Sequence, residues 1–499
     1  MSFFSWLRKR TSNFSGRASS PRHRAARRFR PRLEMLEDRA LLTAYTAATA
    51  ADLIADINAA NKHGGANTIT LAAPTASPYV LTAVNNATDG ANGLPVIGGN
   101  KTDNLTIFGN ADTIERSTAA GTPTFRLFDV ASGSSLTLEL LTLENGVAQG
   151  SGPAADGGAV YNQGSLTLMS ATVQDNTAQG ANGADGLRTQ KKSQSAAING
   201  QAGADAAGGA VWSSGSVSLE GVTILAQNQA LGGSGGAGGV FSGASVDFAG
   251  SGGAGGGGFG GALYLAGGGV NIAAATLTDN TAAGGAGGDA FVSYGGGNWG
   301  GNSDGGSGGV GAGGALFAAG GALEVSNLTV QANQALGGTG GGATLFFEVA
   351  GDGGAAYGGG IDIAGGTATL ATSGLLSNVA QGGKGGSGYN QQGGSGGNAF
   401  GGGLYAGAGT VALTNDTVTG NDAAGGSIGP YVGANDPTAG ISPPGPNNGT
   451  AAGGGIEIAS AAAVSLDSFT VNNTTNNQIF TSFQVWAVSN IDGTYTRLT

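Results

Sequence analysis

The stretch GGAVYNQGSLTLMSATVQDN, residues 157–176, opens with two glycines, alternates small and aliphatic residues, and closes on an asparagine. Six similar stretches follow it along the chain. From the first glycine to the asparagine the distance is 19 residues once and 20 residues six times, whereas successive stretches begin 43 to 53 residues apart. A motif of nearly fixed length between variable intervals is typical of a structural repeat with insertions. The double glycines begin at Gly157, Gly208, Gly260, Gly313, Gly358, Gly401 and Gly453.

Inside each repeat, aliphatic residues alternate with small polar ones, as at Leu166 and Leu168 in the first copy. This period of two predicts strands with one buried face. Three short strands joined by tight turns within about 20 residues predict one coil of a parallel β-helix. The fold class is therefore all-β.

The closing asparagine of every repeat suggests a second regular feature. If the coils stack about 4.8 Å apart, each asparagine lies above the last, and the side-chain amides can hydrogen-bond along the axis. Asparagine also tolerates the left-handed backbone that a sharp corner needs. We predict a structural ladder formed by Asn176, Asn228, Asn280, Asn333, Asn378, Asn421 and Asn473.

The repeats resemble those of the polymorphic outer membrane proteins, whose hallmarks are G-G-A-[ILV] and F-x-x-N. The first hallmark stands as GGAV at 157 and 208 and as GGAL at 260 and 313, and the later copies read GGGI or GGGL. The second hallmark keeps its phenylalanine only in FTVN, residues 469–472. The resemblance covers roughly residues 120–475. It implies a right-handed parallel β-helix and, by analogy, surface display or adhesion.

Segments of a different character flank the repeats. Thr49 to Asp52 form a capping box ahead of LIADINAANKHGG, which predicts a short helix before a strand. We expect residues 45–115 to form an N-terminal cap with this helix, residues 116–475 to form the β-helix repeats with glycine-rich insertions, and residues 476–499 to form a C-terminal cap or hairpin.

The first 44 residues are basic, with 11 Lys and Arg against 3 Asp and Glu, whereas the remainder has 9 against 28. The acidic body should repel nucleic acid. The basic segment is expected to be disordered. Nowhere do 18 apolar residues follow one another, so we expect no transmembrane helix.

Residues 30–44, RPRLEMLEDRALLTA, resemble the L-E-x-L-E-x-R-x-L-L motif at the N-termini of exported planctomycete proteins. The resemblance implies an exported, extracellular or cell-surface protein that contacts the export machinery through this segment. The matching residues are Leu33, Glu34, Leu36, Glu37, Arg39, Leu41 and Leu42.

Glycine supplies 102 of the 499 residues, and much of it lies between the repeats. Two interpretations remain open for these intervals. They can be flexible surface loops. Alternatively, successive glycine strands can pack in an extended layer similar to polyproline II, which the absence of Cβ permits. Aromatic residues over such a layer could stack on sugar rings. These aromatic residues are Phe241, Phe248, Phe291, Tyr294 and Trp299.

Few residues point to chemistry. GGAGGDAFV, residues 284–292, matches the calcium-binding nonapeptide of β-helices, but it stands alone, so Asp289 is a weak candidate metal ligand and calcium a weak candidate cofactor. Isolated acids such as Asp175, Asp279 and Asp362 are interpreted as solvated surface residues. No paired acids recur at the repeat spacing, and no cysteine is present. We therefore predict no catalytic residues and no other cofactor.

Taken together, these features predict an exported structural or adhesin-like protein with no evident catalytic site. Extracellular carbohydrate or other cell-surface molecules are the expected partners. The alternative is a carbohydrate-binding protein or a carbohydrate-active enzyme similar to polysaccharide lyases or hydrolases.

Overall fold

The computed structural model describes residues 43–73, 78–98, 103–187, 199–242, 246–290, 298–299, 303–343, 348–389, 393–432, 447–481 and 484–498. The predicted basic segment therefore lies almost entirely outside the described residues.

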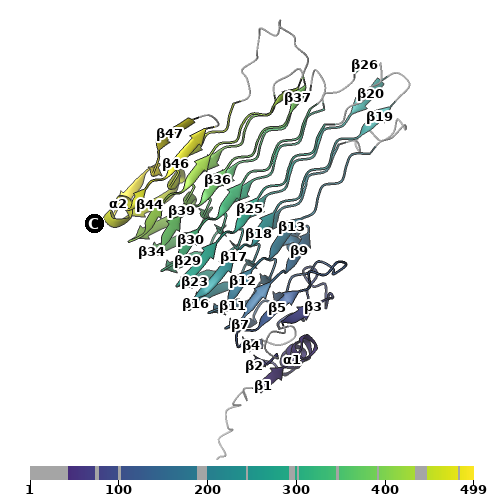
Figure 1. Ribbon diagram of the computed structural model, residues 1–499, viewed down its shortest axis with the longest axis vertical. Coiled ribbons are helices and arrows are strands. Elements are labelled where there is room, and N and C mark those ends of the chain that lie inside the picture. The colour runs from purple at the N-terminus through teal and green to yellow at the C-terminus, as the bar shows by residue number, and fades with distance from the viewer. Residues whose placement is uncertain are drawn as a thin grey trace, which may run out of the picture. The chain divides into compact units, whose positions relative to one another are not determined.

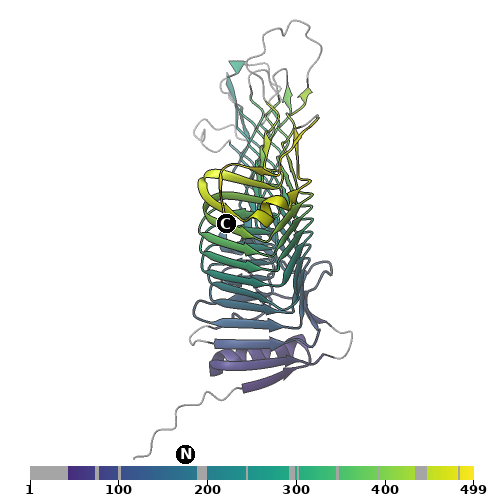
Figure 2. The ribbon, with the colours of Figure 1, turned by 90° about the vertical axis from the view of Figure 1, so that its left-hand side faces the viewer.

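The chain forms a stack of parallel sheets (Figures 1 and 2), which fits the predicted parallel β-helix. Each repeat contributes strands to the larger sheets and pairs in register with the repeats before and after it. We call one such passage through the sheets a rung. For example, Leu166 pairs with Leu136 of the preceding rung and with Val217 of the next.

The largest sheet has 19 strands and receives two consecutive strands from most rungs. Strands that precede a tight turn are β6 (Phe128–Val130), β10 (Val160–Asn162), β15 (Val211–Ser213), β22 (Leu263–Leu265), β28 (Leu316–Ala318) and β33 (Ile361–Ile363). Strands that follow it are β7 (Ser135–Glu139), β11 (Ser165–Met169), β16 (Ser216–Glu220), β23 (Gly269–Ala273), β29 (Ala322–Ser326) and β34 (Thr367–Ala371). Both positions are joined in β39 (Leu404–Thr414) and β44 (Ile456–Leu466). The sheet begins with β1 (Thr43–Ala47), β2 (Gly65–Leu71) and β4 (Asp103–Phe108) and ends with β48 (Ile491–Asp492) and β49 (Tyr495–Arg497).

Three further sheets complete the rungs. The ten-stranded sheet holds β3 (Tyr79–Leu81), β5 (Thr113–Arg116), β8 (Thr142–Glu144), β12 (Thr172–Gln174), β17 (Thr223–Ala226), β24 (Ala275–Thr278), β30 (Thr329–Gln331), β35 (Gly374–Leu376), β40 (Thr417–Thr419) and β45 (Thr474–Thr475). The nine-stranded sheet holds β9 (Val147–Gly150), β13 (Thr177–Gly180), β18 (Gln229–Leu231), β25 (Thr281–Ala283), β31 (Gln334–Leu336), β36 (Val379–Gln381), β41 (Asp422–Ala424), β46 (Gln478–Thr481) and β47 (Gln484–Val488). The six-stranded sheet holds β14 (Ala206–Ala207), β21 (Gly258–Phe259), β27 (Gly311–Ala312), β32 (Ala356–Tyr357), β38 (Ala399–Phe400) and β43 (Ala451–Ala452).

One hydrophobic core runs through the stack and contains the alternating aliphatic residues of the repeats. Leu166, Leu168 and Leu219 have no exposed surface. The double glycines form corners: the first glycine of each pair has a positive φ, such as 66° at Gly157, where a Cβ would lie 2.2 Å from the carbonyl oxygen of Val160. Glycine is therefore required there by both backbone conformation and space.

The helix α1 (Ala50–His63) begins as predicted. The Thr49 side chain accepts a hydrogen bond from the Asp52 N–H and donates one to the Asp52 carboxylate. The segment predicted as a separate N-terminal cap is continuous with the stack, because β2 pairs in register with β4, and β4 with β7. Leu53 and Ile57 of the helix lie in the same core.

The C-terminal residues form the predicted hairpin and then return to the stack. β46 and β47 pair antiparallel, whereas β48 and β49 pair in parallel with β44. A short helix, α2 (Ser468–Asn472), interrupts the last repeat, and a 3-10 turn, η1 (Gly152–Ala155), lies beside β9.

Where the structure describes them, the glycine-rich intervals form extended arms joined by backbone hydrogen bonds, as expected for a packed glycine layer. From six successive rungs one arm leaves the stack and another returns (Figure 1). Gly235 N–H donates to Ala286 O in the next outgoing arm, and Gly236 N–H donates to Gln201 O in a returning arm, both at 2.8 Å. We call these paired arms the glycine wing. Its arms are residues 181–187 and 199–205, 232–239 and 250–257, 284–290 and 303–310, 337–343 and 348–355, 382–389 and 393–398, and 425–432 and 447–450.

Bonding in the wing repeats every three residues, as in polyproline II. In most arms, two residues of each three are glycines that face neighbouring backbones, and the third points outward. The arms 181–187 and 199–205 have only one glycine in three. Short pairings extend the wing: β19 (Val240–Ser242), β20 (Val246–Ala249) and β26 (Asn298–Trp299), and separately β37 (Gly388–Tyr389) and β42 (Tyr431–Val432).

Candidate functional site: an aromatic–acid column

Aromatic and acidic side chains form one column on the large sheet. They occupy the middle position of the strands that precede the tight turn, so parallel pairing places each one beside its equivalents in the neighbouring rungs. We call this set the aromatic–acid column. In order along the stack, its members are Asp129, Tyr161, Trp212, Tyr264, Phe317, Asp362, Tyr405, Glu457 and Asp492.

The four consecutive rings stack nearly parallel. Ring centroids lie 4.4 Å apart for Tyr161 and Trp212, 6.3 Å for Trp212 and Tyr264, and 5.1 Å for Tyr264 and Phe317, with interplanar angles below 10°. Because the ring faces cover one another, these rings do not offer open faces for stacking on sugars. Rings from the six-stranded sheet pack beside the column. The ring centroids of Phe259 and Phe317 lie 5.3 Å apart, and those of Tyr357 and Tyr405 lie 4.9 Å apart.

Arg126 covers the first ring of the stack. Its guanidinium carbon lies 4.8 Å from the centroid of Tyr161, and the side chain has no exposed surface. Nη2 donates to Asp89 O at 2.9 Å and to Pro153 O, so Arg126 joins two loops. Within the described part of the chain, Arg126 Nε and Nη1 are buried without a hydrogen-bond partner.

Two acids lie in the electrostatic field of this buried arginine. Burial raises the pKa of Asp129 and of Asp156 to about 7, although the positive charge of Arg126 lowers both. Burial also lowers the pKa of Arg126. Asn92 donates to Asp129 Oδ2 at 3.5 Å, while Asp129 Oδ1 has no partner among the described residues. Nothing in the sequence spacing indicated this cluster, since its members come from separate loops and strands.

Two further acids flank Tyr405 in the column. Asp362 is only 3% exposed, and burial raises its pKa to about 8. Burial, and then the negative charge of Asp492, raise the pKa of Glu457 to about 7. Two rungs of about 4.8 Å separate the backbones of these two acids. Burial therefore shifts both carboxyl groups toward the protonated form near neutral pH.

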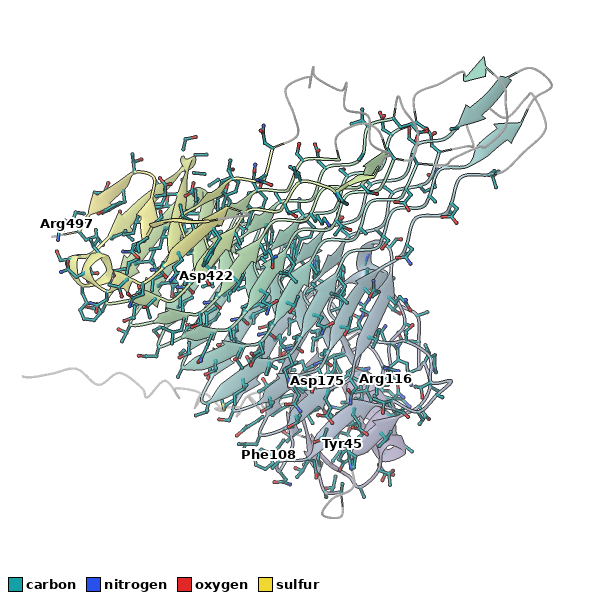
Figure 3. All side chains as sticks on the ribbon, turned by 45° about the horizontal axis from the view of Figure 1, so that its top comes forward. Tyr45, Phe108, Arg116, Asp175, Asp422 and Arg497 are labelled. Carbon is teal, nitrogen blue, oxygen red and sulfur yellow. The ribbon has the colours of Figure 1, made fainter. Side chains whose placement is uncertain are left out.

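The interpretation of Asp362 as a solvated residue is therefore wrong. The alternation of β33 places Asp362 on the outer face of its strand, but the neighbouring rings cover it there. Asp175 and Asp279 do lie exposed, at left-handed corners with φ near 55° (Figure 3 labels Asp175).

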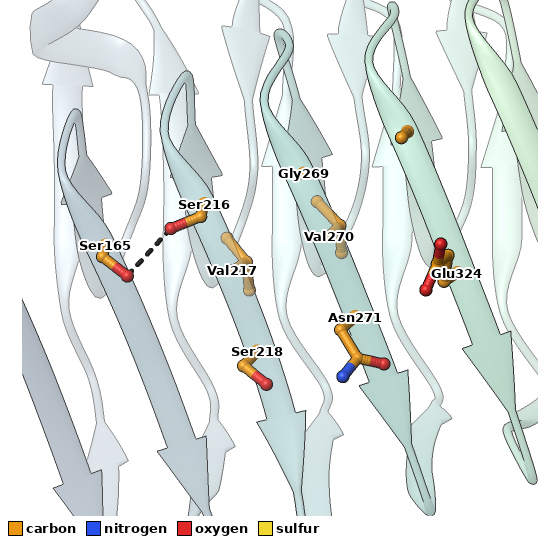
Figure 4. A pocket seen from close by; sticks show the side chains of 9 residues that line it. Ser165, Ser216, Val217, Ser218, Gly269, Val270, Asn271 and Glu324 are labelled. Carbon is orange, nitrogen blue, oxygen red and sulfur yellow. Dashed lines mark hydrogen bonds between the residues drawn. The ribbon is translucent and has the colours of Figure 1, made fainter.

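A shallow hollow of about 340 Å³ lies on the outer face of the large sheet (Figure 4). It opens where Gly269 and Ala322 take the place of the serines in β11 and β16, and Ser216 Oγ donates to Ser165 Oγ at 2.8 Å at one end. Asn271 and Glu324 provide amide and carboxylate groups. The hollow can accept a ligand that carries hydroxyl groups.

The structure places six of the seven predicted ladder asparagines in one buried column. In each step, the side-chain oxygen of one asparagine accepts from the backbone N–H and the side-chain amide of the preceding one. Between Asn228 and Asn280 both distances are 3.0 Å. The six asparagines are Asn176, Asn228, Asn280, Asn333, Asn378 and Asn421.

The seventh position was wrong. Asn477 accepts from Asn421 N–H and Nδ2, both at 2.9 Å, whereas Asn473 ends helix α2 and donates to Phe469 O. The helix adds residues within the last repeat and displaces the ladder residue by four positions. The left-handed corner residue is also not the asparagine but the one before it, such as Asp175 with φ 56°.

Asp289 lies in the glycine wing, exposed, and its Oδ1 accepts from Gly342 N–H at 2.7 Å. It therefore joins two successive outgoing arms. Among the residues that the structure describes, no group of three or more His, Cys, Asp and Glu is arranged to hold a metal ion. The side chains of the five wing aromatics lie outside the described part of the structure.

None of the described helices is long and apolar enough to cross a membrane. Comparisons with protein-family models, with curated proteins and with solved structures find no match to this chain.

Proposed function

We propose that this chain is an exported structural or adhesin-like protein of the cell surface or extracellular space. We also propose that it is a right-handed parallel β-helix whose helix α1 caps its first coil. The observation that carries the functional proposal is the glycine wing. In the wing, hydrogen-bonded arms of successive rungs leave the stack and extend the molecule far beyond its hydrophobic core. Such an ordered extension suits display and contact rather than enclosure of a small substrate.

Support for export comes from the resemblance of residues 30–44 to an export-associated motif. Fractionation of the native cells, followed by protease treatment of intact cells, tests this proposal. We expect the protein in the envelope or the medium and cleavage by external protease. A strictly cytoplasmic protein that is protected in intact cells would refute export.

The proposed partner is a carbohydrate or another hydroxyl-rich surface molecule bound at the hollow on the large sheet. Asn271 and Glu324, which are partners on neighbouring strands, can hydrogen-bond to hydroxyl groups, and Gly269 and Ala322 beside them are small. The test is retention of the purified protein on a panel of insoluble polysaccharides. Glu324→Ala should reduce retention at least fivefold, while the matched change Asp279→Ala at an exposed corner should not. Equal retention of both variants would place binding elsewhere.

A second candidate, a carbohydrate-active β-helix enzyme, is favoured by one observation. Asp362 and Glu457 lie in one column on either side of Tyr405, and burial raises the pKa of both carboxyl groups, to about 8 and about 7. A protonated carboxylic acid can act as general acid toward a glycosidic oxygen. Release of reducing ends or of unsaturated uronates from polysaccharides is the measurement. Activity that Asp362→Asn and Glu457→Gln both abolish would support the enzyme, and activity unchanged by either variant would exclude these acids.

A further inference from the structure

The glycines of the wing follow a strict spatial rule. In the columns through Gly233, Gly236, Gly253 and Gly256, every described residue after the first rung is a glycine whose Cβ would point to the rung beneath. An added Cβ at Gly236 would lie 2.1 Å from Ala184 O, and one at Gly253 would lie 1.9 Å from Gln201 O. The same clash recurs at each later step, as at Gly288 against Gly236 O and at Gly306 against Gly253 O. In these columns a Cβ has no space where another arm lies beneath.

The first rung of the wing breaks this rule at the equivalent positions. The columns that continue through Gly236, Gly253 and Gly256 begin with Ala184, Gln201 and Ala204. Ala184 and Gln201 are exposed, whereas the glycines above them are buried. Among the described residues no further arm lies on this side of the wing, where the side chains of Ala184 and Gln201 are exposed. A fourth column begins with Ala181, whose N–H donates to Gly150 O in the stack at 2.6 Å.

The backbone of this first rung has the same shape as the rungs above it and would otherwise accept another strand. Within the wing, glycine N–H groups of one arm donate hydrogen bonds to the carbonyl oxygens of outward-facing residues in the next arm. Gly183 N–H donates to Ser234 O, and Gly186 N–H donates to Ala237 O. In the first rung, the carbonyl groups of Asn182 and Asp185 stand at the positions of those two acceptors. An incoming Gly-Gly-X strand has complementary N–H groups. Exposed edges of this kind recruit other chains.

We propose that Ala184, Gln201 and Ala204 form an edge stop that prevents a Gly-Gly-X strand of a second copy of this chain from adding to the wing. A carbonyl oxygen of an added strand would lie about 2 Å from each Cβ, as the equivalent glycine positions show. That is more than 1 Å inside an ordinary carbon–oxygen contact, so the strand cannot approach to hydrogen-bonding distance. The edge stop is independent of the proposed export and of any ligand.

The test is the triple variant Ala184→Gly/Gln201→Gly/Ala204→Gly in the full chain. Sedimentation velocity measures self-association, and fluorescence anisotropy measures binding of a labelled peptide of Gly-Gly-Ser repeats. We expect the variant to bind this peptide at least tenfold more tightly than the unchanged protein, and to associate increasingly with concentration. A peptide of Ala-Ala-Ser repeats should bind neither protein.

The matched control is Ala184→Ser/Ala204→Ser, which keeps a Cβ at both positions and should behave as the unchanged protein. Amide exchange of the wing establishes that the arms remain paired in each variant. If the triple variant loses that protection, the double variant Ala184→Gly/Gln201→Gly decides with the same two readouts. The proposal is overturned if the glycine variant matches the unchanged protein in both measurements, or if the unchanged protein binds the peptide equally well.

Discussion

Each central asparagine of the ladder uses all of its side-chain hydrogen-bonding groups for neighbouring rungs. Asn280 Oδ1 accepts from Asn228, and Asn280 Nδ2 donates to Leu225 O and to Asn333 Oδ1, all between 2.9 and 3.0 Å. These groups have no exposed surface, so water cannot take the place of a lost hydrogen bond. Loss of one member strands polar groups on both neighbours, which costs about 1–3 kcal/mol for each stranded group.

The displaced ladder position offers a direct test. Asn477→Ala removes an acceptor of two bonds from Asn421 and a donor to Val418 O, so we expect it to lower the free energy of unfolding by about 3 kcal/mol. Asn473→Ala removes a single exposed bond at the end of α2 and should cost less than about 1 kcal/mol. Urea unfolding followed by circular dichroism measures both. Equal losses would contradict the assignment of Asn477 to the column.

Asp362 should make stability depend on pH in the sense opposite to ordinary acid denaturation. The pKa of its carboxyl is about 8 in the folded chain against 3.8 in the unfolded chain. The folded state therefore binds more protons between these values, and the free energy of unfolding falls as pH rises from about 4 to about 8. In Asp362→Asn the side chain stays neutral, so this part of the decline should vanish, on the order of several kcal/mol.

Thermal unfolding at pH 4.5 and pH 8.5 measures this effect. We expect the midpoint of the unchanged protein to drop more between the two pH values than that of the variant. Asp175→Asn, an exposed corner substitution, is the matched control and should follow the unchanged protein. Parallel pH dependence in all three proteins would show that Asp362 is not buried as a neutral acid.

At the scale of the element, each wing arm is stabilised by backbone hydrogen bonds rather than by apolar side chains. Glycine loses more conformational entropy on ordering than any other residue, so an isolated arm would not remain extended. Bonds to arms above, below and across compensate for this loss. Outward-facing Asp and Asn side chains accept further hydrogen bonds between rungs; for example, the Ser395 N–H donates to Asp352 Oδ1 at 2.7 Å.

Close packing makes a single added methyl group costly in the wing. In Gly341→Ala, the Cβ would lie 2.0 Å from Gly288 O, so the arms must separate locally, at about 2–4 kcal/mol. Thr339→Ala, two residues earlier in the same arm, changes an outward-facing exposed side chain and should have little effect. Hydrogen–deuterium exchange resolved by peptide should show faster exchange in the wing of Gly341→Ala and unchanged exchange in the stack. Uniform exchange in both variants would argue against a packed wing.

Over the whole described molecule, one core joins all rungs, and each rung packs chiefly on its two neighbours. The stability of such a stack is approximately the sum of contributions from each rung and each interface. A charge placed in the core of one rung therefore disrupts that rung and the two interfaces beside it.

Leu219→Asp tests the continuity of this core. Leu219 has no exposed surface, so the variant buries an unpaired carboxylate and should lose about 4 kcal/mol or more of unfolding free energy. Ser216→Asp, on the same strand but exposed, should cost less than about 1 kcal/mol. Little change in the thermal unfolding of Leu219→Asp would show that this strand face is not buried.

Local sequence was sufficient to predict the strands, the glycine corners and most of the asparagine ladder. The period-two alternation at Leu166 and Leu168, the corner at Gly157 and the capping of α1 by Thr49 each depend on residues close together in the chain. The error at Asn473 arose because a short helix inside the last repeat changes the residue count without changing the motif. The aromatic–acid column was missed because its neighbouring members lie 32 to 53 residues apart in the sequence and become neighbours only through parallel pairing.

By itself, the sequence determined that this protein is a stack of short parallel strands, because alternation, corner glycines and a nearly constant repeat length act over a few residues. Only the tertiary structure decided between loose loops and an ordered wing, because a glycine arm has no side chains with which to specify its own packing. It also decided which acids are solvated. The burial of Asp362 depends on rings from neighbouring rungs. The side chains of Ala184 and Gln201 can block a further strand only because the fold places them at the edge of the wing.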